Sequence, residues 1–156
     1  MYALAIFLPL IGAVLAGFFG HWLKPRGAQI VTCGCMLLSA VIACVILAEV
    51  ALGHAPRTIE LFSWINSGAF EVNWTLRFDT LTAVMVFVVT VVSSMVHVYS
   101  VGYMSHDPHI QRFMAYLGFF TFFMLMLVSA DNLLQMFFGW EGVGLCSYLL
   151  IGFWYE

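Results

Sequence analysis

Residues 133–154 read LLQMFFGWEGVGLCSYLLIGFW and contain a single charged side chain, Glu141. An α-helix needs about 20 predominantly apolar residues to cross the hydrocarbon core of a bilayer. This stretch has that length and composition, and Glu141 lies close to its middle. The stretch therefore predicts a transmembrane helix with a carboxyl group at the depth of the lipid tails.

Four further apolar stretches of similar length precede this one. Only helices and closed β-barrels can span a bilayer, and the stretches lack the period-2 alternation of a barrel strand. We therefore expect an all-α membrane protein that forms one membrane domain over residues 1–156. Its five transmembrane helices are predicted at about residues 2–23, 28–52, 81–103, 113–130 and 133–154.

The composition supports a membrane protein. Of the 156 residues, 63% are hydrophobic and 8% are charged, whereas about 25% are charged in an ordinary soluble domain. A soluble fold of this size buries only about two-thirds of the surface of its unfolded chain, so it could not hide this much apolar surface. The composition excludes a soluble globular enzyme, and the absence of a basic block gives no footprint for nucleic acid.

The segment 57–77 differs from the apolar stretches around it. Apolar and polar residues alternate on both sides of Asn66-Ser67-Gly68. This pattern favours a short extramembrane β-hairpin between the second and third helices. An irregular amphipathic loop is the alternative interpretation.

The positions of the basic residues predict how the chain is oriented. Positively charged flanks prefer the cytoplasmic side of a membrane. Placing the Lys24–Arg26 loop inside puts the amino terminus and the hairpin outside. Arg112 then also lies inside, whereas Arg57 and Arg77 lie outside.

Glu141 is the first candidate functional residue. A carboxyl group in hydrocarbon can stay protonated, or it can ionise against a cation from another helix. Exchange between these states is the physical basis of a proton relay, and an intramembrane carboxylate is a functional hypothesis by default. We expect Gly139, Gly142 and Gly144 to permit close helix packing near it. A protonated glutamate that only bonds across a helix interface is the alternative.

Other polar groups in the spans extend this hypothesis. Gln135 and Tyr148 are expected on roughly the same side of the helix as Glu141. His97, in the third span, is the second candidate, because a neutral imidazole can accept and donate a proton. A packed histidine with one satisfied hydrogen bond is the alternative interpretation of His97.

No cofactor or metal site is expected in this chain. The four cysteines lie in apolar stretches without zinc or iron–sulfur spacing, so we interpret them as packing residues: Cys33, Cys35, Cys44 and Cys146. Motifs for phosphate, flavin, haem or nicotinamide binding are absent as well. Any redox centre is therefore expected in other chains.

Several motifs together resemble one family. Residues 139–155 (GWEGVGLCSYLLIGFWY) resemble the signature of the distal, largest antiporter-like subunit of proton-pumping NADH:quinone oxidoreductase, respiratory complex I. Further similar stretches are SWI (63–65), FDTLTAVM (78–85), HVYSVGYM (97–104), RFMAYLGFF (112–120) and LVSADNLLQMFFGWE (127–141).

The resemblance implies a role for each matching position. Glu141 matches the membrane glutamate of the family, which is thought to pair with a lysine two helices later and to modulate proton movement. Segment 57–77 matches an outer-face hairpin that touches the neighbouring antiporter-like subunit. The family's subunit is several times longer, so we interpret this chain as its amino-terminal part.

The resemblance also implies the surroundings of the protein. Other membrane subunits of complex I and the lipid bilayer would be its partners, in a bacterial cell membrane or a mitochondrial inner membrane. FMN, iron–sulfur clusters and quinone would be bound by other subunits. Two alternatives stay open: a subunit of a multi-chain Na⁺/H⁺ antiporter, and a membrane scaffold that does not transport.

Overall fold

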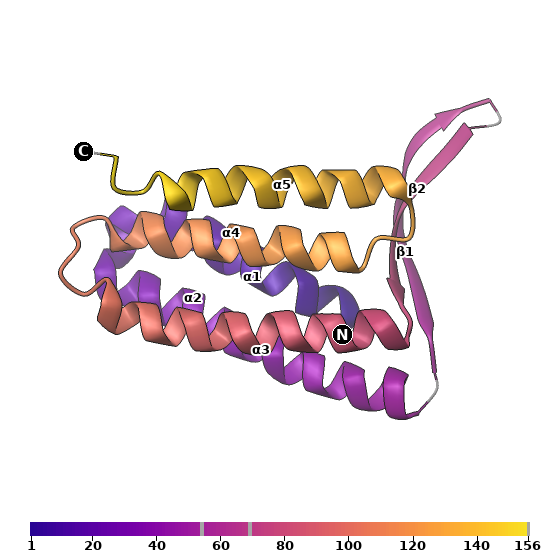
Figure 1. Ribbon diagram of the computed structural model, residues 1–156, viewed down its shortest axis with the longest axis horizontal. Helices are drawn as coiled ribbons and strands as arrows, with labels where there is room; N and C mark the ends of the chain where they lie inside the picture. Colours follow the sequence, from indigo (N-terminus) through magenta and orange to yellow (C-terminus); the bar gives the residue numbers. More distant parts are fainter. Residues whose placement is uncertain (54, 69, 156) are drawn as a thin grey trace.

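The computed structural model describes residues 1–53, 55–68 and 70–155. Five helices lie side by side, and a two-stranded hairpin crosses one end of them (Figure 1). In chain order the elements are α1 (Tyr2–Phe18), α2 (Gly20–Leu47), a π-helical turn (Ala48–Leu52), β1 (Arg57–Ser67), β2 (Phe70–Phe78), α3 (Thr80–Tyr103), α4 (Ile110–Val128) and α5 (Leu133–Ile151). The predicted helices and the predicted hairpin between the second and third of them are confirmed.

Four of the five predicted spans have the length of a membrane span. Helix α2 with its π-helical turn, α3, α4 and α5 are long and apolar enough to cross a bilayer. Helix α1 is shorter than the predicted span 2–23, because it ends at Phe18 and has 17 residues. At 1.5 Å per residue it is about 25 Å long, slightly less than the hydrocarbon core.

The predicted Lys24–Arg26 loop is a kink within α2. Lys24 has φ 58° and ψ 168°, outside helical geometry, and Pro25 follows it. The proline ring disfavours helical geometry in the preceding residue, but proline itself fits the first position of a helix. The chain therefore bends at Lys24 and is helical again from Pro25, without an intervening loop.

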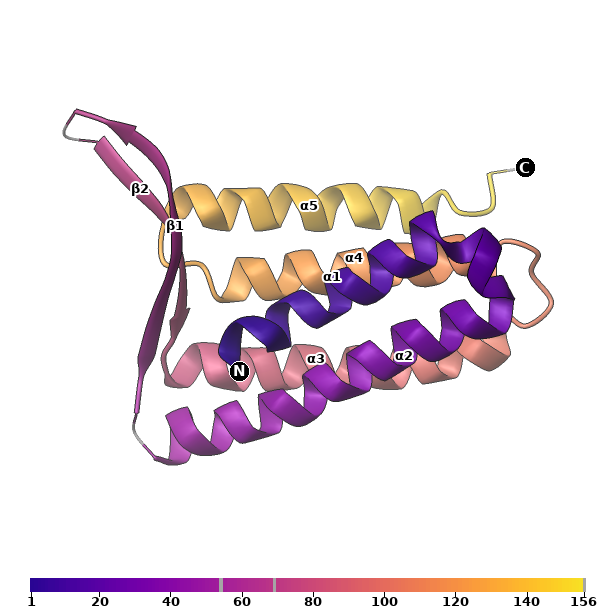
Figure 2. The same ribbon diagram turned by 180° about the vertical axis from the view of Figure 1, so that it is seen from behind.

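Helix α1 lies across α2 and α4 and packs against both (Figure 2). The main apolar core lies towards the hairpin end, where α1, α2, α3 and α4 meet β2. Its fully buried members include Ile6, Ile46, Leu76, Phe78, Val86 and Leu125. Helix α5 packs mainly along α4, which leaves much of its surface uncovered.

The hairpin pairs antiparallel from Arg57 opposite Phe78 to Ser67 opposite Phe70. Its pairing shifts between Glu60 and Phe62 and again between Ser63 and Ile65, as β-bulges do. Gly68 has φ +64°, a backbone conformation that glycine adopts without strain. Asn66 and Ser67 still belong to β1, and Ser67 pairs with Phe70, so the turn begins later than the predicted Asn66–Gly68 turn. Ala69 lies outside the described residues.

Side chains from the start of α5 hold the hairpin in place. Asn132 caps α5 by accepting the N–H of Gln135 at 2.9 Å, and its Nδ2 donates to Asn73 O at 2.8 Å. The fully buried Gln135 accepts the N–H of Thr75 at 3.0 Å. Because these bonds join β2 to the first turn of α5, the hairpin and the helix that carries Glu141 are held as one unit.

Candidate functional site

Helix α5 has one packed face and one open face. Gly139 and Gly142 are buried against α4. A Cβ atom at Gly139 would lie 2.6 Å from the backbone nitrogen of Leu127, and one at Gly142 would overlap the ring of Phe123. These two glycines therefore let α4 and α5 pack closely, as small residues do at helix contacts in membranes.

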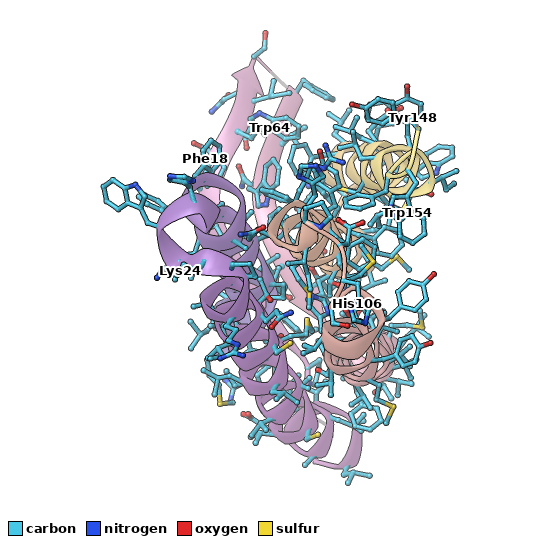
Figure 3. All side chains as sticks on the ribbon, turned by 90° about the vertical axis from the view of Figure 1, so that its left-hand side faces the viewer. Phe18, Lys24, Trp64, His106, Tyr148 and Trp154 are labelled. Atoms are coloured by element: carbon cyan, nitrogen blue, oxygen red, sulfur yellow. The ribbon has the colours of Figure 1, made fainter. Side chains whose placement is uncertain are left out.

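Glu141 lies on the open face. It is exposed in this structure and is one residue from the middle of α5, Leu133–Ile151. Gly144 shares this face, and a Cβ atom there would meet no atom within 4 Å. Tyr148 is 74% exposed and points away from the other helices (Figure 3). Within the described part of the chain, Glu141 has no hydrogen-bond or ion-pair partner.

The expectation that Gln135 shares the side of Glu141 is wrong. Gln135 is fully buried and turned towards β2, whereas Glu141 is exposed. Six residues correspond to a rotation of about 240° in a helix with 3.6 residues per turn. Tyr148, seven positions from Glu141, returns to the same side as predicted.

His97 belongs to a series of hydrogen-bonded polar groups between α3 and α4. Its side chain is 1% exposed, and Nδ1 donates to the carbonyl oxygen of Ser93 at 2.8 Å. Ser93 Oγ lies 2.5 Å from Thr121 Oγ1, which in turn donates to Leu117 O at 3.0 Å. With the proton on Nδ1, the other ring nitrogen is the one that could accept a further proton.

These hydrogen bonds fit a packed histidine as well as a proton relay. The last acceptor in the series is a backbone carbonyl within α4, so the described bonds join two helices without forming a path across the membrane. Sequence reasoning missed Thr121, because nothing in the sequence indicates that it faces Ser93 across 28 positions. The relay role of His97 stays a prediction.

The described residues do not bring the two candidates together. His97 belongs to the contact between α3 and α4, and Glu141 faces away from α4 on α5. Helix α4 lies between α3 and α5 (Figure 1). Any exchange of charge between Glu141 and His97 would therefore need other groups.

Charged groups at the hairpin end form ordinary surface contacts. Arg57 lies 3.5 Å from Glu49, and Arg77 lies 3.7 Å from Asp79 and 3.9 Å from Asp131. Asp79 caps α3 by accepting the N–H of Thr82 at 2.8 Å, and this hydrogen bond holds the pKa of its carboxyl below its usual value. These pairs are partly exposed and position the loops without forming a reactive site.

Two family models match parts of this chain. Residues 64–114 match the family model described as NADH-ubiquinone oxidoreductase (complex I), chain 5 N-terminus. Residues 130–156 match the model described as NADH:quinone oxidoreductase/Mrp antiporter, TM. The second match contains the whole of α5, with Glu141.

Relatives align over nearly all of this chain. NADH-ubiquinone oxidoreductase chain 5 is 55% identical in Chondrus crispus and 54% identical in Arabidopsis thaliana, in each case over 99% of this chain and 23% of the relative. The same protein of Cryphonectria parasitica is 51% identical over 99% of this chain and 24% of its own length. The chain thus spans about a quarter of the length of these relatives.

The long apolar helices are those of a multi-pass membrane protein, and its last helix matches a model of the membrane region shared by NADH:quinone oxidoreductases and Mrp antiporters. Within that class, the chain belongs to the family of NADH:quinone oxidoreductase chain 5 and corresponds to its amino-terminal portion.

Proposed function

We propose that this chain is part of a subunit that translocates protons across a membrane, in a complex that passes electrons from NADH to quinone. The names of its relatives support this proposal. The structural observation that carries it is Glu141, a carboxyl group at the middle of α5 on the face that no other described helix covers.

The proposal expects further helices beside Glu141, which would supply a charged or polar partner for its carboxyl group. A charged side chain at the centre of a membrane helix costs roughly 2.5–3.5 kcal/mol on insertion scales unless it is paired. The relatives are about four times longer than this chain, and their additional helices could supply a cation for Glu141. The exposed Gly144, one turn away, leaves room for a helix to approach.

The proposed chemistry follows from electrostatics. A nearby cation favours the ionised form of Glu141, and withdrawal of that cation into another contact favours the protonated form. Movement of charge elsewhere in the complex would thereby make Glu141 release or take up a proton. His97 could take up and release a proton in the same way between α3 and α4.

The surroundings of the chain form part of the proposal. FMN, iron–sulfur clusters and quinone would be held by other subunits. The hairpin would contact the neighbouring antiporter-like subunit, because its tip projects beyond the helices (Figure 1) and its residues Phe62 and Phe70 are each 54% exposed. The membrane would be a bacterial cell membrane or a mitochondrial inner membrane.

Substitution of Glu141 in the full-length subunit, assembled in its complex, tests the proposal. Glu141→Gln keeps the side-chain shape but cannot ionise, so we expect assembly and NADH oxidation to continue while fewer protons are pumped per electron. Glu141→Asp, the matched control, keeps the carboxyl group and should retain more pumping. Normal pumping with Glu141→Gln would contradict the proposal, and loss of assembly in both variants would favour the scaffold alternative.

A multi-chain Na⁺/H⁺ antiporter subunit is the second candidate function. It is favoured by the match of residues 130–156 to a model that also describes Mrp antiporters. Purification of the native complex separates the two candidates. Flavin and iron–sulfur absorbance should accompany a respiratory subunit, whereas Na⁺-dependent proton exchange without these chromophores would support the antiporter.

A further inference from the structure

The chain folds back towards an earlier part of the sequence directly after α5. Helix α5 ends at Ile151, and residues 152–155 reach the connection between α3 and α4, residues 104–109. Figure 3 looks onto this end of the bundle and shows Trp154 between Tyr148 of α5 and His106 of that connection. The segment after α5 thus contacts a part of the chain that lies more than 40 positions earlier.

Phe153 is the buried residue of this segment. Its side chain is 5% exposed and packs in a small apolar cluster with Met104, Ile110 and Met114. The guanidinium carbon of Arg112 lies 4.7 Å from the centre of the Phe153 ring, and Arg112 donates to Phe153 O at 3.4 Å. Both the side chain and the backbone of Phe153 are therefore held by the start of α4.

Trp154 adds a directional contact. Its indole N–H donates to Oδ2 of Asp107 at 2.8 Å, and Oδ1 of Asp107 accepts the N–H of His109 at 2.7 Å. These bonds, that of Trp154 first, hold the pKa of Asp107 below its usual value, so its carboxyl group is ionised at neutral pH. Hydrogen bonds to an ionised acceptor are stronger than those between neutral groups. Because Trp154 is 63% exposed, this bond fixes its side chain more than burial does.

Helix α5 is therefore held at both ends. At the hairpin end, Asn132 and Gln135 bond to β2. At the other end, Phe153 and Trp154 bind the start of α4 and the connection before it. Between these ends α5 packs mainly along α4, and Glu141 lies on the face that no other described helix covers. The direction in which Glu141 points thus depends on the ends of α5 as well as on α4.

The place of the Glu141 carboxyl group is sensitive to rotation of α5. A side chain reaches about 5 Å from the helix axis, so a turn of α5 by about 20° moves this carboxyl group by about 2 Å. A displacement of about 1 Å at a reacting group can lower a rate about 100-fold. The attraction between two charges also weakens as their distance grows. A loosened end of α5 would therefore disturb any exchange of charge at Glu141.

We propose that Trp154 is a positioning residue for Glu141, with Asp107 as its acceptor. The bond between the two side chains fixes the end of α5 and keeps Glu141 turned towards its partner. Neither Trp154 nor Asp107 takes up or releases a proton in this role. The role rests on the proposed function of Glu141, but the place of the helix can be measured independently of pumping.

Trp154→Phe in the full-length subunit, assembled in its complex, tests the proposal. Phenylalanine keeps an aromatic ring but lacks the N–H that Asp107 accepts. The amides of Gly152 and Phe153 donate to carbonyl groups at the end of α5. We expect their hydrogen exchange to be about fivefold faster, as loss of one hydrogen bond predicts. Fewer protons should be pumped per electron while NADH oxidation continues.

The infrared absorption of the Glu141 carboxyl group separates positioning from a merely structural role. It is the carboxyl absorption that Glu141→Gln lacks, and we expect Trp154→Phe to shift it. Asp107→Asn should shift it as well, because the amide nitrogen that replaces one oxygen cannot accept an N–H.

Trp22→Phe is the matched control. Trp22 lies at the same end of the bundle, near the start of α2, and is 81% exposed. Its indole N–H has no hydrogen-bond partner in the part of the chain that the structure describes. We expect this variant to leave the hydrogen exchange, the Glu141 absorption and pumping unchanged.

Three results would overturn the proposal. Unchanged exchange in Trp154→Phe would show that the bond does not hold the end of α5. An unshifted Glu141 absorption would leave Trp154 a structural residue, and so would normal pumping in Trp154→Phe where Glu141→Gln pumps less. Normal pumping in Glu141→Gln would instead overturn the proposed function, and the absorption would then decide whether Trp154 positions the carboxyl group. If Trp154→Phe does not assemble, the same measurements on Asp107→Asn decide.

Discussion

Substitution of Gly139 by alanine should loosen the contact that positions the carboxyl-bearing helix. The added Cβ would lie 2.6 Å from Leu127 N and 2.8 Å from Leu127 Cα, so it meets backbone atoms that no side-chain rotation can move. Helices α4 and α5 must separate to admit it. Such overpacking costs about 1–3 kcal/mol, partly offset by the roughly 1 kcal/mol that alanine gains over glycine inside a helix.

Gly34→Ala is the matched control for this prediction. Gly34 also lies inside a membrane helix, α2, but a Cβ there would meet no atom within 4 Å. It should therefore show the gain in helix propensity without the clash. The assay is the thermal midpoint of the assembled complex in native membranes, with NADH oxidation as the measure of intact protein.

We expect the midpoint to fall for Gly139→Ala and to stay level or rise for Gly34→Ala. Pumping should also fall in Gly139→Ala complexes that remain assembled, because α5 carries Glu141 away from its place. Equal midpoints in the two variants would refute the close packing of α4 on α5 as the structure describes it.

Three further substitutions test the contacts around this site. Gln135→Leu should destabilise the subunit by about 1–3 kcal/mol and speed hydrogen exchange at the Thr75 amide, because it leaves that buried N–H without its acceptor; unchanged exchange would contradict the anchor. Ser93→Ala should cost about 1 kcal/mol, because it removes the hydroxyl that lies 3.3 Å from His97 Nδ1 and 2.5 Å from Thr121 Oγ1, although the bond from His97 Nδ1 to Ser93 O remains. Ser105→Ala, on an exposed serine, should cost less in the same thermal assay. Asp79→Asn should weaken the pH dependence of stability at acid pH. The folded-state pKa of Asp79 is lowered, so its contribution is present above the unfolded pKa of about 3.9 and is lost as pH falls through the folded value; an unchanged acid limb in pH-dependent thermal melts would refute this role.

The number of helices could be predicted from the sequence because each apolar stretch is long and separated by polar residues. The hairpin was predictable because apolar and polar residues alternate on both sides of Asn66–Gly68, although the same pattern left an irregular amphipathic loop as the alternative. The boundaries near Lys24 were harder. The apolar run continues past Phe18, so hydropathy alone extends the first span, although Pro25 is a local signal for the break that the structure places at Lys24.

The faces of α5 were only partly predictable. Glycines 139 and 142 signal a close helix contact, and this contact is with α4. The side of Gln135 follows from helical geometry, but its partner Thr75 lies 60 positions away, and no local pattern identifies it. The same limit applies to Ser93 and Thr121, since contacts between helices depend on how the whole bundle packs.

Infrared difference spectroscopy of the full complex tests the central claim most directly, because it observes the protonation of carboxyl groups during turnover. The account predicts a carboxyl band that changes when NADH is added, that is absent from Glu141→Gln and that is shifted in Glu141→Asp. A band that persists in Glu141→Gln, or that does not respond to NADH, would contradict the claim that Glu141 takes up and releases a proton.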